Sequence, residues 1–181
     1  MVKTVEIARA EWRASEGSPK PDVSFVPMME RRRLTGVERA AFAVAHEAME
    51  AAGETRPVPV VFASRWGEIG TTLKLMRQMH DEGEMSPAGF SASVHNAAPG
   101  AWSLFTRSTA PYTAIAARGR SKEMGLLEAR SQLEEALRGD PSARVLFVYA
   151  EETTPEFYEP HFGEPCPAMA EAVLLGGEGA T

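Results

Sequence analysis

The apolar residues of this chain fall into short unbroken runs, separated by longer stretches in which they recur at helical spacing. Two such runs are PVPVVFAS, over Pro57–Ser64, and RVLFVYA, over Arg144–Ala150, and continuous Val and Phe are typical of strands buried on both faces. Further strands are predicted at the short apolar segment Tyr112–Ala117, at the weakly alternating Lys3–Ala8 and at Val173–Leu175. The pattern therefore predicts five strands.

Helical spacing fills the segments between these runs. Thr35–Ala52 carries apolar residues three and four apart, and Thr35 followed by Glu38 is the capping-box pattern that begins a helix. Three more helices are predicted, at Gly67–His80, from a start capped by Asn96, and at Ser121–Arg138. Residues 81–89 are predicted as a loop. The alternation of strands and helices predicts an α/β fold with a largely parallel sheet flanked by helices, in a single domain over residues 1–181.

Composition limits the classes of function. The chain has 181 residues, is 44% hydrophobic and 24% charged, and carries a net charge of −6, which is ordinary for a globular protein and disfavours a nucleic-acid partner. No apolar run approaches the roughly 20 residues that cross a bilayer, and the N-terminus lacks the apolar core of a secretory signal. We therefore expect a cytoplasmic protein with no membrane association.

No metal or cofactor site is apparent in the sequence. The four histidines are scattered without metal-ligand spacing, and the segments RWGEIG and LLGGEG match neither a dinucleotide-binding motif nor a P-loop. The single cysteine, Cys166, lies between two prolines in a predicted extended loop. It is either a reactive thiol or an incidental loop residue, and the incidental role is favoured because no cationic neighbour is apparent. We expect no metal and no cofactor.

Two polar groups have competing interpretations. The basic cluster Arg31–Arg33 is either a phosphate contact, for instance to the phosphopantetheine of a carrier protein, or a solvated patch, which we favour in an acidic protein. In FSASVHNAAPG, His95 and Asn96 either line a ligand site or serve locally, with Asn96 as a helix cap.

The segments taken in order resemble the N-terminal half of a β-ketoacyl synthase, in the thiolase-like superfamily. RRRLTGVERA is similar to the start of the family's early helix, PVPVVFASRWGE to a strand that ends before a Gly, and SPAGFSASVHNAAPG to the segment before the central helix. RVLFVYAEE and EAVLLGGE are similar to the strand that ends in acidic residues and to the last strand of that half. SVHNA and GLLEA are most similar to the chain-length-factor-like proteins of aryl polyene and related pigment clusters.

The resemblance also locates the family's nucleophile position. In that family a Gly-Pro pair opens a strand that ends in Thr-Ala-Cys, and the cysteine accepts the acyl group. Here Ala110-Pro111 opens the strand, and an alignment without gaps from the proline puts Gly119 at the cysteine position. Gly119 permits a tight strand-to-helix turn but cannot form a thioester. The family's two catalytic histidines belong to the C-terminal half, which we expect to lie beyond the end of this chain.

The resemblance implies a non-catalytic, chain-length-factor type of subunit that pairs with a complete ketosynthase in fatty-acid, polyketide or aryl polyene biosynthesis. It implies pairing along the strand before the turn, through Pro111, Tyr112, Thr113, Ala114, Ile115, Ala116 and Ala117. It also implies that the subunit shapes an acyl tunnel, with candidate residues His95, Asn96, Trp102, Phe105 and Tyr112; for the large side chains the alternative is core packing. An acyl carrier protein is a further implied partner.

Two other functions remain open. One is a compact acyltransferase or hydrolase on the same fold, for which Ser93 and His95 are the candidate residues, although no orienting acid is apparent. The other is a stand-alone homodimeric module that binds acyl groups. Copurification with a ketosynthase separates the heterodimeric subunit from this module, and turnover of an acyl thioester by the chain alone indicates the enzyme.

Overall fold

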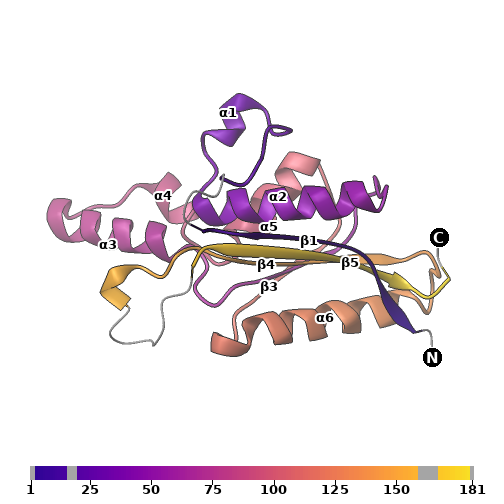
Figure 1. Cartoon of the computed structure of the whole chain (residues 1–181). Helices are drawn as coiled ribbons and strands as arrows, with labels where there is room; N and C mark the ends of the chain where they lie inside the picture. The colour runs from indigo at the N-terminus through magenta and orange to yellow at the C-terminus, as the bar shows by residue number, and fades with distance from the viewer. Residues whose placement is uncertain (1–2, 16–19, 159–166, 180–181) are drawn as a thin grey trace.

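A computed structural model describes residues 3–15, 20–158 and 167–179 (Figure 1). In these ranges five strands form one sheet in the order β1-β5-β4-β2-β3. The strands are β1 (Thr4–Arg13), β2 (Val60–Ala63), β3 (Tyr112–Ile115), β4 (Arg144–Glu151) and β5 (Met169–Gly177). β2 pairs in parallel with β3 and β4, whereas β5 pairs antiparallel with β4 and β1. Four strands therefore share one direction, and β5 alone runs the other way.

The predicted α/β class and the five strands are confirmed, and the sheet is mixed because β5 lies inside it. β1 is longer than predicted, since its pairing with β5 extends to Arg13 opposite Met169. β3 is shorter and ends at Ile115, which is paired with Ala63 at the end of β2. Beyond it, the backbone N–H of Ala117 donates to the Ser121 hydroxyl instead of a neighbouring strand.

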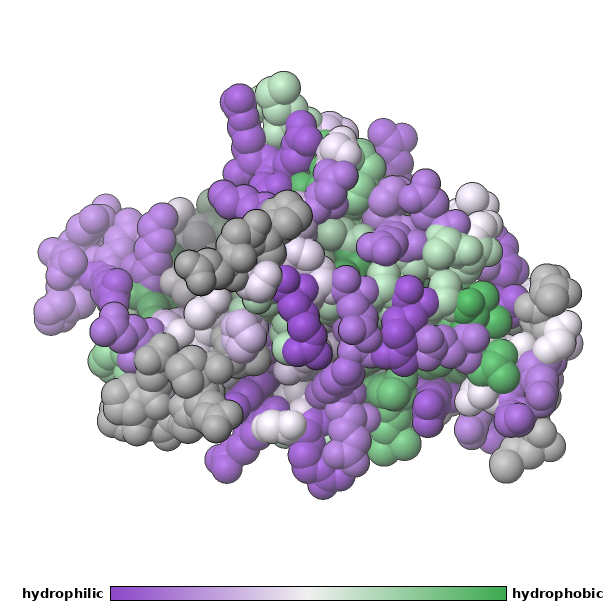
Figure 2. Space-filling view, viewed as in Figure 1, coloured by the Kyte–Doolittle hydropathy of each residue, from purple (hydrophilic) through white to green (hydrophobic). Residues whose placement is uncertain are grey.

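Helices cover both faces of the sheet (Figure 1). They are α1 (Met28–Arg31), α2 (Gly36–Ala51), α3 (Ile69–Glu82), α4 (Pro87–Ser91), α5 (Ala97–Thr106) and α6 (Ser121–Ala136), with short 3-10 turns η1 (Arg118–Arg120) and η2 (Glu156–Tyr158). α2 and α5 lie over one face and α6 over the other, whereas α3 and α4 extend beyond the sheet. Figure 2 shows hydrophilic side chains over most of the visible face, with smaller hydrophobic patches between them.

The predicted capping box is present at the start of α2. The Thr35 hydroxyl accepts a hydrogen bond from the Glu38 N–H (3.0 Å), and the Glu38 carboxyl accepts one from the Thr35 N–H (2.9 Å). Thr35 therefore satisfies donors that the first turn of a helix leaves without intrahelical partners. Its hydroxyl also donates to Glu68 Oε1 (2.8 Å), at the start of α3.

The sequence prediction was wrong in two places between α3 and α5. Residues 81–89 are not a continuous loop, because α3 continues to Glu82 and ends at Gly83 in the left-handed conformation (φ 76°). α4 then begins at Pro87, after Ser86 caps it with a hydrogen bond from the Gly89 N–H to the serine hydroxyl. Asn96 does occupy the N-cap position of α5, but its side chain makes no capping hydrogen bond.

The apolar core has a layer on each side of the sheet. One layer packs α2 against β1, β4 and β5 and α5 against β2, with Val44, Phe62 and Leu146 among its buried members. The other packs α6 against the opposite face through Leu133 and Phe147. Such double coverage explains why β2 and β4 have unbroken apolar sequences.

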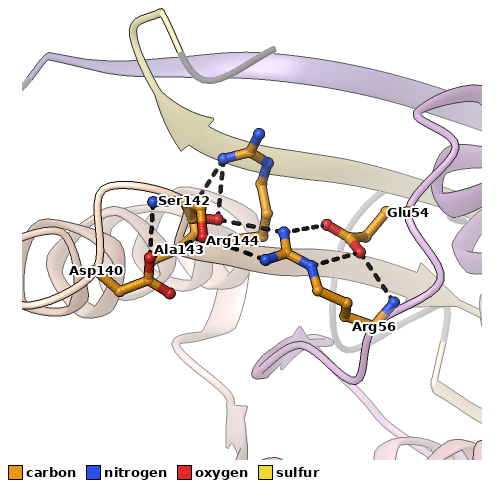
Figure 3. A network of polar contacts seen from close by, with 6 residues as sticks. All are labelled: Glu54, Arg56, Asp140, Ser142, Ala143 and Arg144. Atoms are coloured by element: carbon orange, nitrogen blue, oxygen red, sulfur yellow. Dashed lines mark hydrogen bonds and ion pairs between the residues drawn. The ribbon is translucent and has the colours of Figure 1, made fainter.

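A polar network closes the end of the sheet at which β2 and β4 begin (Figure 3). Arg56 donates to both carboxyl oxygens of Glu54 and to the Ser142 hydroxyl, while Asp140 accepts from the Ser142 N–H. The Arg56 guanidinium lowers the pKa of Glu54 to about 2. The network joins the segment before β2 to the turn between α6 and β4. The opposite end of the sheet, where these strands finish, carries the buried carboxylates described below.

Candidate functional site

The turn between β3 and α6 is built around one buried serine. The Ser121 hydroxyl accepts from the Ala117 N–H (2.9 Å) and donates to the Arg118 carbonyl (2.7 Å), and Ser121 is only 1% exposed. These two bonds hold a tight turn in which Arg118 has a left-handed backbone (φ 53°). Such a conformation is uncommon for residues other than glycine, and such strain is enriched at functional sites.

The left-handed residue in this turn is Arg118, not Gly119, to which the sequence analysis assigned the tight turn. A Cβ on Gly119 would meet no atom within 4 Å, and its φ lies outside the left-handed range. Arg118, Gly119 and Arg120 are all exposed. Neither Arg118 nor Gly119 has a thiol or hydroxyl, and the Ser121 hydroxyl is buried and used on both sides. The turn thus presents no nucleophilic side chain at these positions.

β3 lies at an edge of the sheet, because β2 is its neighbour on one side and no described strand lies on the other. The Pro111 and Ile115 carbonyls accept from the N–H groups of Val60 and Ser64 on the β2 side. Because alternate residues of a strand direct their backbone groups to opposite sides, the N–H groups of Tyr112 and Ala114 point away from β2.

The side chains of the predicted interface differ in exposure. Pro111, Tyr112 and Ala116 are exposed, and Thr113, Ala114, Ile115 and Ala117 are half-buried. The Thr113 hydroxyl accepts from the Gln132 side-chain amide on α6 (3.0 Å). The edge therefore combines outward backbone groups with mostly apolar side chains.

Three of the five acyl-tunnel candidates line one groove of about 700 Å³ between α2, α4 and α5. They are Asn96, Phe105 and Tyr112. Apolar side chains such as Val26, Phe42 and Leu104 form much of the remaining wall, together with the charged Glu30, Arg33 and Glu38. The volume lies within the usual range for small-molecule sites, roughly 300–1,000 Å³.

The other two candidates do not line this groove. Trp102 packs into the aromatic core against Phe42, with ring centroids 5.1 Å apart and an edge-on geometry. His95 Nε2 is 3.0 Å from the Ser64 carbonyl oxygen, and its ring lies edge-on to Phe62. Phe105 packs in the same aromatic cluster, with its ring centroid 5.7 Å from that of Phe42. The role of these residues in an acyl tunnel stays a prediction.

Ser93 and His95, the candidates for an acyltransferase or hydrolase, make separate contacts. The Ser93 hydroxyl donates to the Phe90 carbonyl (2.8 Å), while the His95 ring contacts Ser64. A nucleophile–base pair requires the two side chains within hydrogen-bond reach of each other. The contacts found for the described residues do not include one between them.

The three arginines of the basic cluster Arg31–Arg33 also have different environments. The Arg31 carbonyl accepts from the Arg39 guanidinium (3.0 Å), Arg32 is exposed and Arg33 lines the groove. Cys166 and its proposed roles lie outside the described residues.

Sequence reasoning missed a buried carboxylate behind the turn that follows β2. The Ser64 hydroxyl donates to Glu151 Oε2 (3.0 Å) and accepts from the Gly67 N–H (2.7 Å), and Glu151 also accepts from the N–H groups of Arg65 and Trp66. Burial raises the pKa of Glu151, and these hydrogen bonds oppose the rise. The available signal was the pair Glu151-Glu152 directly after an apolar run, because the carboxyl ends of neighbouring parallel strands meet at one edge.

Three more carboxyl groups meet nearby, and we call Glu38, Glu68 and Glu152 the acidic junction. Glu68 is 3% exposed, and burial, with Glu38 and Glu152 adding repulsion, raises its pKa to about 8. Burial also raises the pKa of Glu38 and of Glu152, which accepts from the Gly70 N–H (2.6 Å). Ion pairs found in the described part of the chain do not involve these three residues.

The described residues lack both a metal cluster and a helix able to cross a bilayer. They contain no group of three or more His, Cys, Asp or Glu side chains placed to hold a metal ion. None of their helices combines the length and apolarity that a bilayer crossing requires.

Comparison with known proteins links this geometry to one family. The profile described as Beta-ketoacyl synthase, N-terminal domain, matches residues 6–181. A search of curated proteins gave no significant match.

Several solved structures share the fold. A ketosynthase (ApeO) in complex with its chain length factor (ApeC), from Xenorhabdus doucetiae, matches 90% of this chain at 25% identity with a TM-score of 0.76. A β-ketoacyl synthase from Burkholderia phymatum STM815 matches 98% at 15% identity and a TM-score of 0.69. A type II PKS acyl-carrier protein in complex with its ketosynthase, AntDE:AntF, matches 86% at 15% identity and a TM-score of 0.69. The matches cover 66%, 59% and 51% of those chains.

Proposed function

Because the chain belongs to the β-ketoacyl synthase N-terminal domain family and has the thiolase-like half fold, we propose that it is a non-catalytic subunit of the chain-length-factor type. It pairs with a complete ketosynthase in fatty-acid, polyketide or aryl polyene biosynthesis. The proposal takes residues 1–181 as one domain.

The observation that carries this proposal is the β3-to-α6 turn. Its left-handed residue is Arg118 and the next is Gly119. The N-terminal side of α6 therefore has a cationic side chain and a glycine where an acyl-accepting thiol would be needed. The partner ketosynthase supplies the nucleophile. The family likeness also supports this role, since the Xenorhabdus doucetiae structure pairs a ketosynthase with a chain length factor.

The partner is proposed to add to the edge of β3 over residues 111–117. The N–H groups of Tyr112 and Ala114 point away from β2, and an edge without a described neighbouring strand is a ready template for another strand. The groove beside Tyr112 is proposed to continue the partner's acyl tunnel, with Phe105 and Asn96 in its wall. An acyl carrier protein delivers the chain to the ketosynthase in this scheme.

Coexpression with a complete ketosynthase tests the proposal. We expect a stable one-to-one complex on size-exclusion chromatography and no acyl-thioester turnover by this chain alone. Self-association without a ketosynthase would instead support the homodimeric acyl-binding module, and turnover by the chain alone would support the enzyme.

Two variants test the interface. Ala114→Pro removes only an outward N–H, so it should abolish the complex while the uncomplexed chain still melts cooperatively. Thr113→Pro is the matched control, because it removes an N–H on the β2 side and should lower the melting temperature. If Ala114→Pro fails to fold, Ala116→Glu places a charge on an exposed position of the same edge. A complex that survives a folded edge variant would exclude this interface.

A further inference from the structure

Helices α3 and α4 form an arm, residues Ile69–Ser91, that extends beyond the sheet (Figure 1). The arm has its own internal contacts. The Ser86 N–H donates to the Gln78 side chain (3.3 Å), and a Cβ on Gly89 would lie 2.8 Å from Leu75 Cδ2. Leu75 is the one residue of α3 that is buried, and Met76 and Met79 are 60% and 48% exposed. The arm therefore buries little apolar surface against the body of the protein.

The arm is fastened at its first turn by polar contacts with the acidic junction. Glu68, at the N-cap position of α3, accepts from the Thr35 hydroxyl of α2 (2.8 Å). Glu152, after β4, accepts from the Gly70 N–H (2.6 Å). A Cβ on Gly70 would lie 2.8 Å from Glu152 Oε2, so the close approach depends on glycine. The Ser93 carbonyl and the Thr72 hydroxyl add a long contact of 3.5 Å.

The groups that face Glu68 come from each neighbouring element. Glu38 faces it from α2, Glu152 from the segment after β4, and the Thr71 side chain hydrogen-bonds it from α3. His95 lies close by, on the segment before α5, where its ring would be 3.1 Å from a Cβ on Gly67. Both charged neighbours that act on Glu68 are carboxyl groups, so an ionised Glu68 would be a buried negative charge beside two others.

We propose that the protonation state of Glu68 controls how firmly the α3–α4 arm is held: the neutral carboxyl fastens it, and the ionised carboxyl releases it. The neutral form keeps the Thr35 bond without adding charge to the junction. Ionisation sets three carboxylates against one another at the first turn of the arm, where Glu68 and Gly70 are bound to the body. The arm detaches from the body before the core unfolds, because local opening occurs first in elements that have few buried apolar contacts. The proposal is independent of the one for a ketosynthase partner.

The test uses the full chain with ¹³C-labelled methionine methyl groups, recorded from pH 6 to 9.5. The arm contains three reporter methionines, Met76, Met79 and Met85. The body is reported by Met49 on α2 and Met169 on β5. We expect the arm methyl resonances to shift with a midpoint near pH 8, the pKa of Glu68, while the body resonances stay in place.

Two variants separate Glu68 from other causes. Glu68→Gln should abolish the shift, whereas Glu82→Gln, which removes a carboxylate from the far end of α3, should retain it. The proposal is overturned if the arm resonances do not titrate, if they titrate unchanged in Glu68→Gln (which would assign the change to another group), or if arm and body resonances move together.

Discussion

The Thr35 hydroxyl donates a 2.8 Å hydrogen bond to Glu68 Oε1 and so joins the N-terminus of α2 to the N-terminus of α3. The same hydroxyl accepts from the Glu38 N–H within the capping box. The Thr35 side chain thereby satisfies a backbone donor in the first turn of α2 and also holds the first residue before α3 in place. The consequences can be measured as stability, as pH dependence and as local order.

Glu68→Gln should make folding stability less dependent on pH. The pKa of Glu68 is raised from 4.5 to about 8, so between these values the folded chain keeps a proton that the unfolded chain has lost. Stability therefore falls as pH rises through this window, by up to about 1.4 kcal/mol per pH unit. The free energy of unfolding, measured by urea denaturation at pH 5, 6, 7 and 8, should fall less steeply with pH for Glu68→Gln than for the wild type. A residual slope is expected, because burial also raises the pKa of Glu38, Glu151 and Glu152. An unchanged slope would contradict the burial of Glu68.

Thr35→Ala should lower the free energy of unfolding by about 1–2 kcal/mol, as the loss of a helix N-cap does. The change removes the acceptor for the Glu38 N–H and the donor to Glu68 together. Thr35→Ser keeps the hydroxyl and should lose little stability. Equal losses in the two variants, measured by urea denaturation at pH 7, would indicate that the methyl group matters and the hydroxyl does not.

Gly125→Ala should destabilise the contact between α6 and the sheet. A Cβ there would lie 2.6 Å from Ala63 Cβ and 2.8 Å from Phe147 Cε2, both in the buried layer under α6. Overpacking of this kind costs about 1–3 kcal/mol. Gly119→Ala is the matched control, since its Cβ would meet no atom within 4 Å, and it should leave the melting temperature nearly unchanged. A neutral Gly125→Ala would mean that α6 can move away from the sheet at little cost.

Gly119→Cys should fold and should carry a reactive thiol. The position has room for a side chain, lies in the turn η1 that leads into α6 and is flanked by Arg118 and Arg120. A helix N-terminus and neighbouring cations favour the thiolate. In a Cys166→Ser background, alkylation by iodoacetamide at pH 7 should be about tenfold faster than for Gly139→Cys, which lies just beyond the other end of the same helix. Equal rates would show that the turn does not activate a thiol.

Local patterns predicted much of the fold correctly. The capping box at Thr35 and Glu38, the helix that begins at Ser121 and the apolar runs of β2 and β4 were all readable, because each depends on residues close together in the chain. The errors arose where a local signal was weak. α4 is five residues long, and Asn96 holds a cap position without making the capping bond.

The sequence by itself determined the strands and longer helices and which residues stand at the turn after β3, since periodicity, capping and residue identity are local properties. Only the tertiary structure decided that Arg118 takes the left-handed conformation and that Phe105 and Tyr112 line a groove that Trp102 does not line. It also decided the pairing of Ser64 with Glu151 and of Thr35 with Glu68, which are 87 and 33 positions apart. The pKa values of these carboxyl groups depend on burial and on neighbours that folding brings together. Neither can be predicted from spacing along the chain.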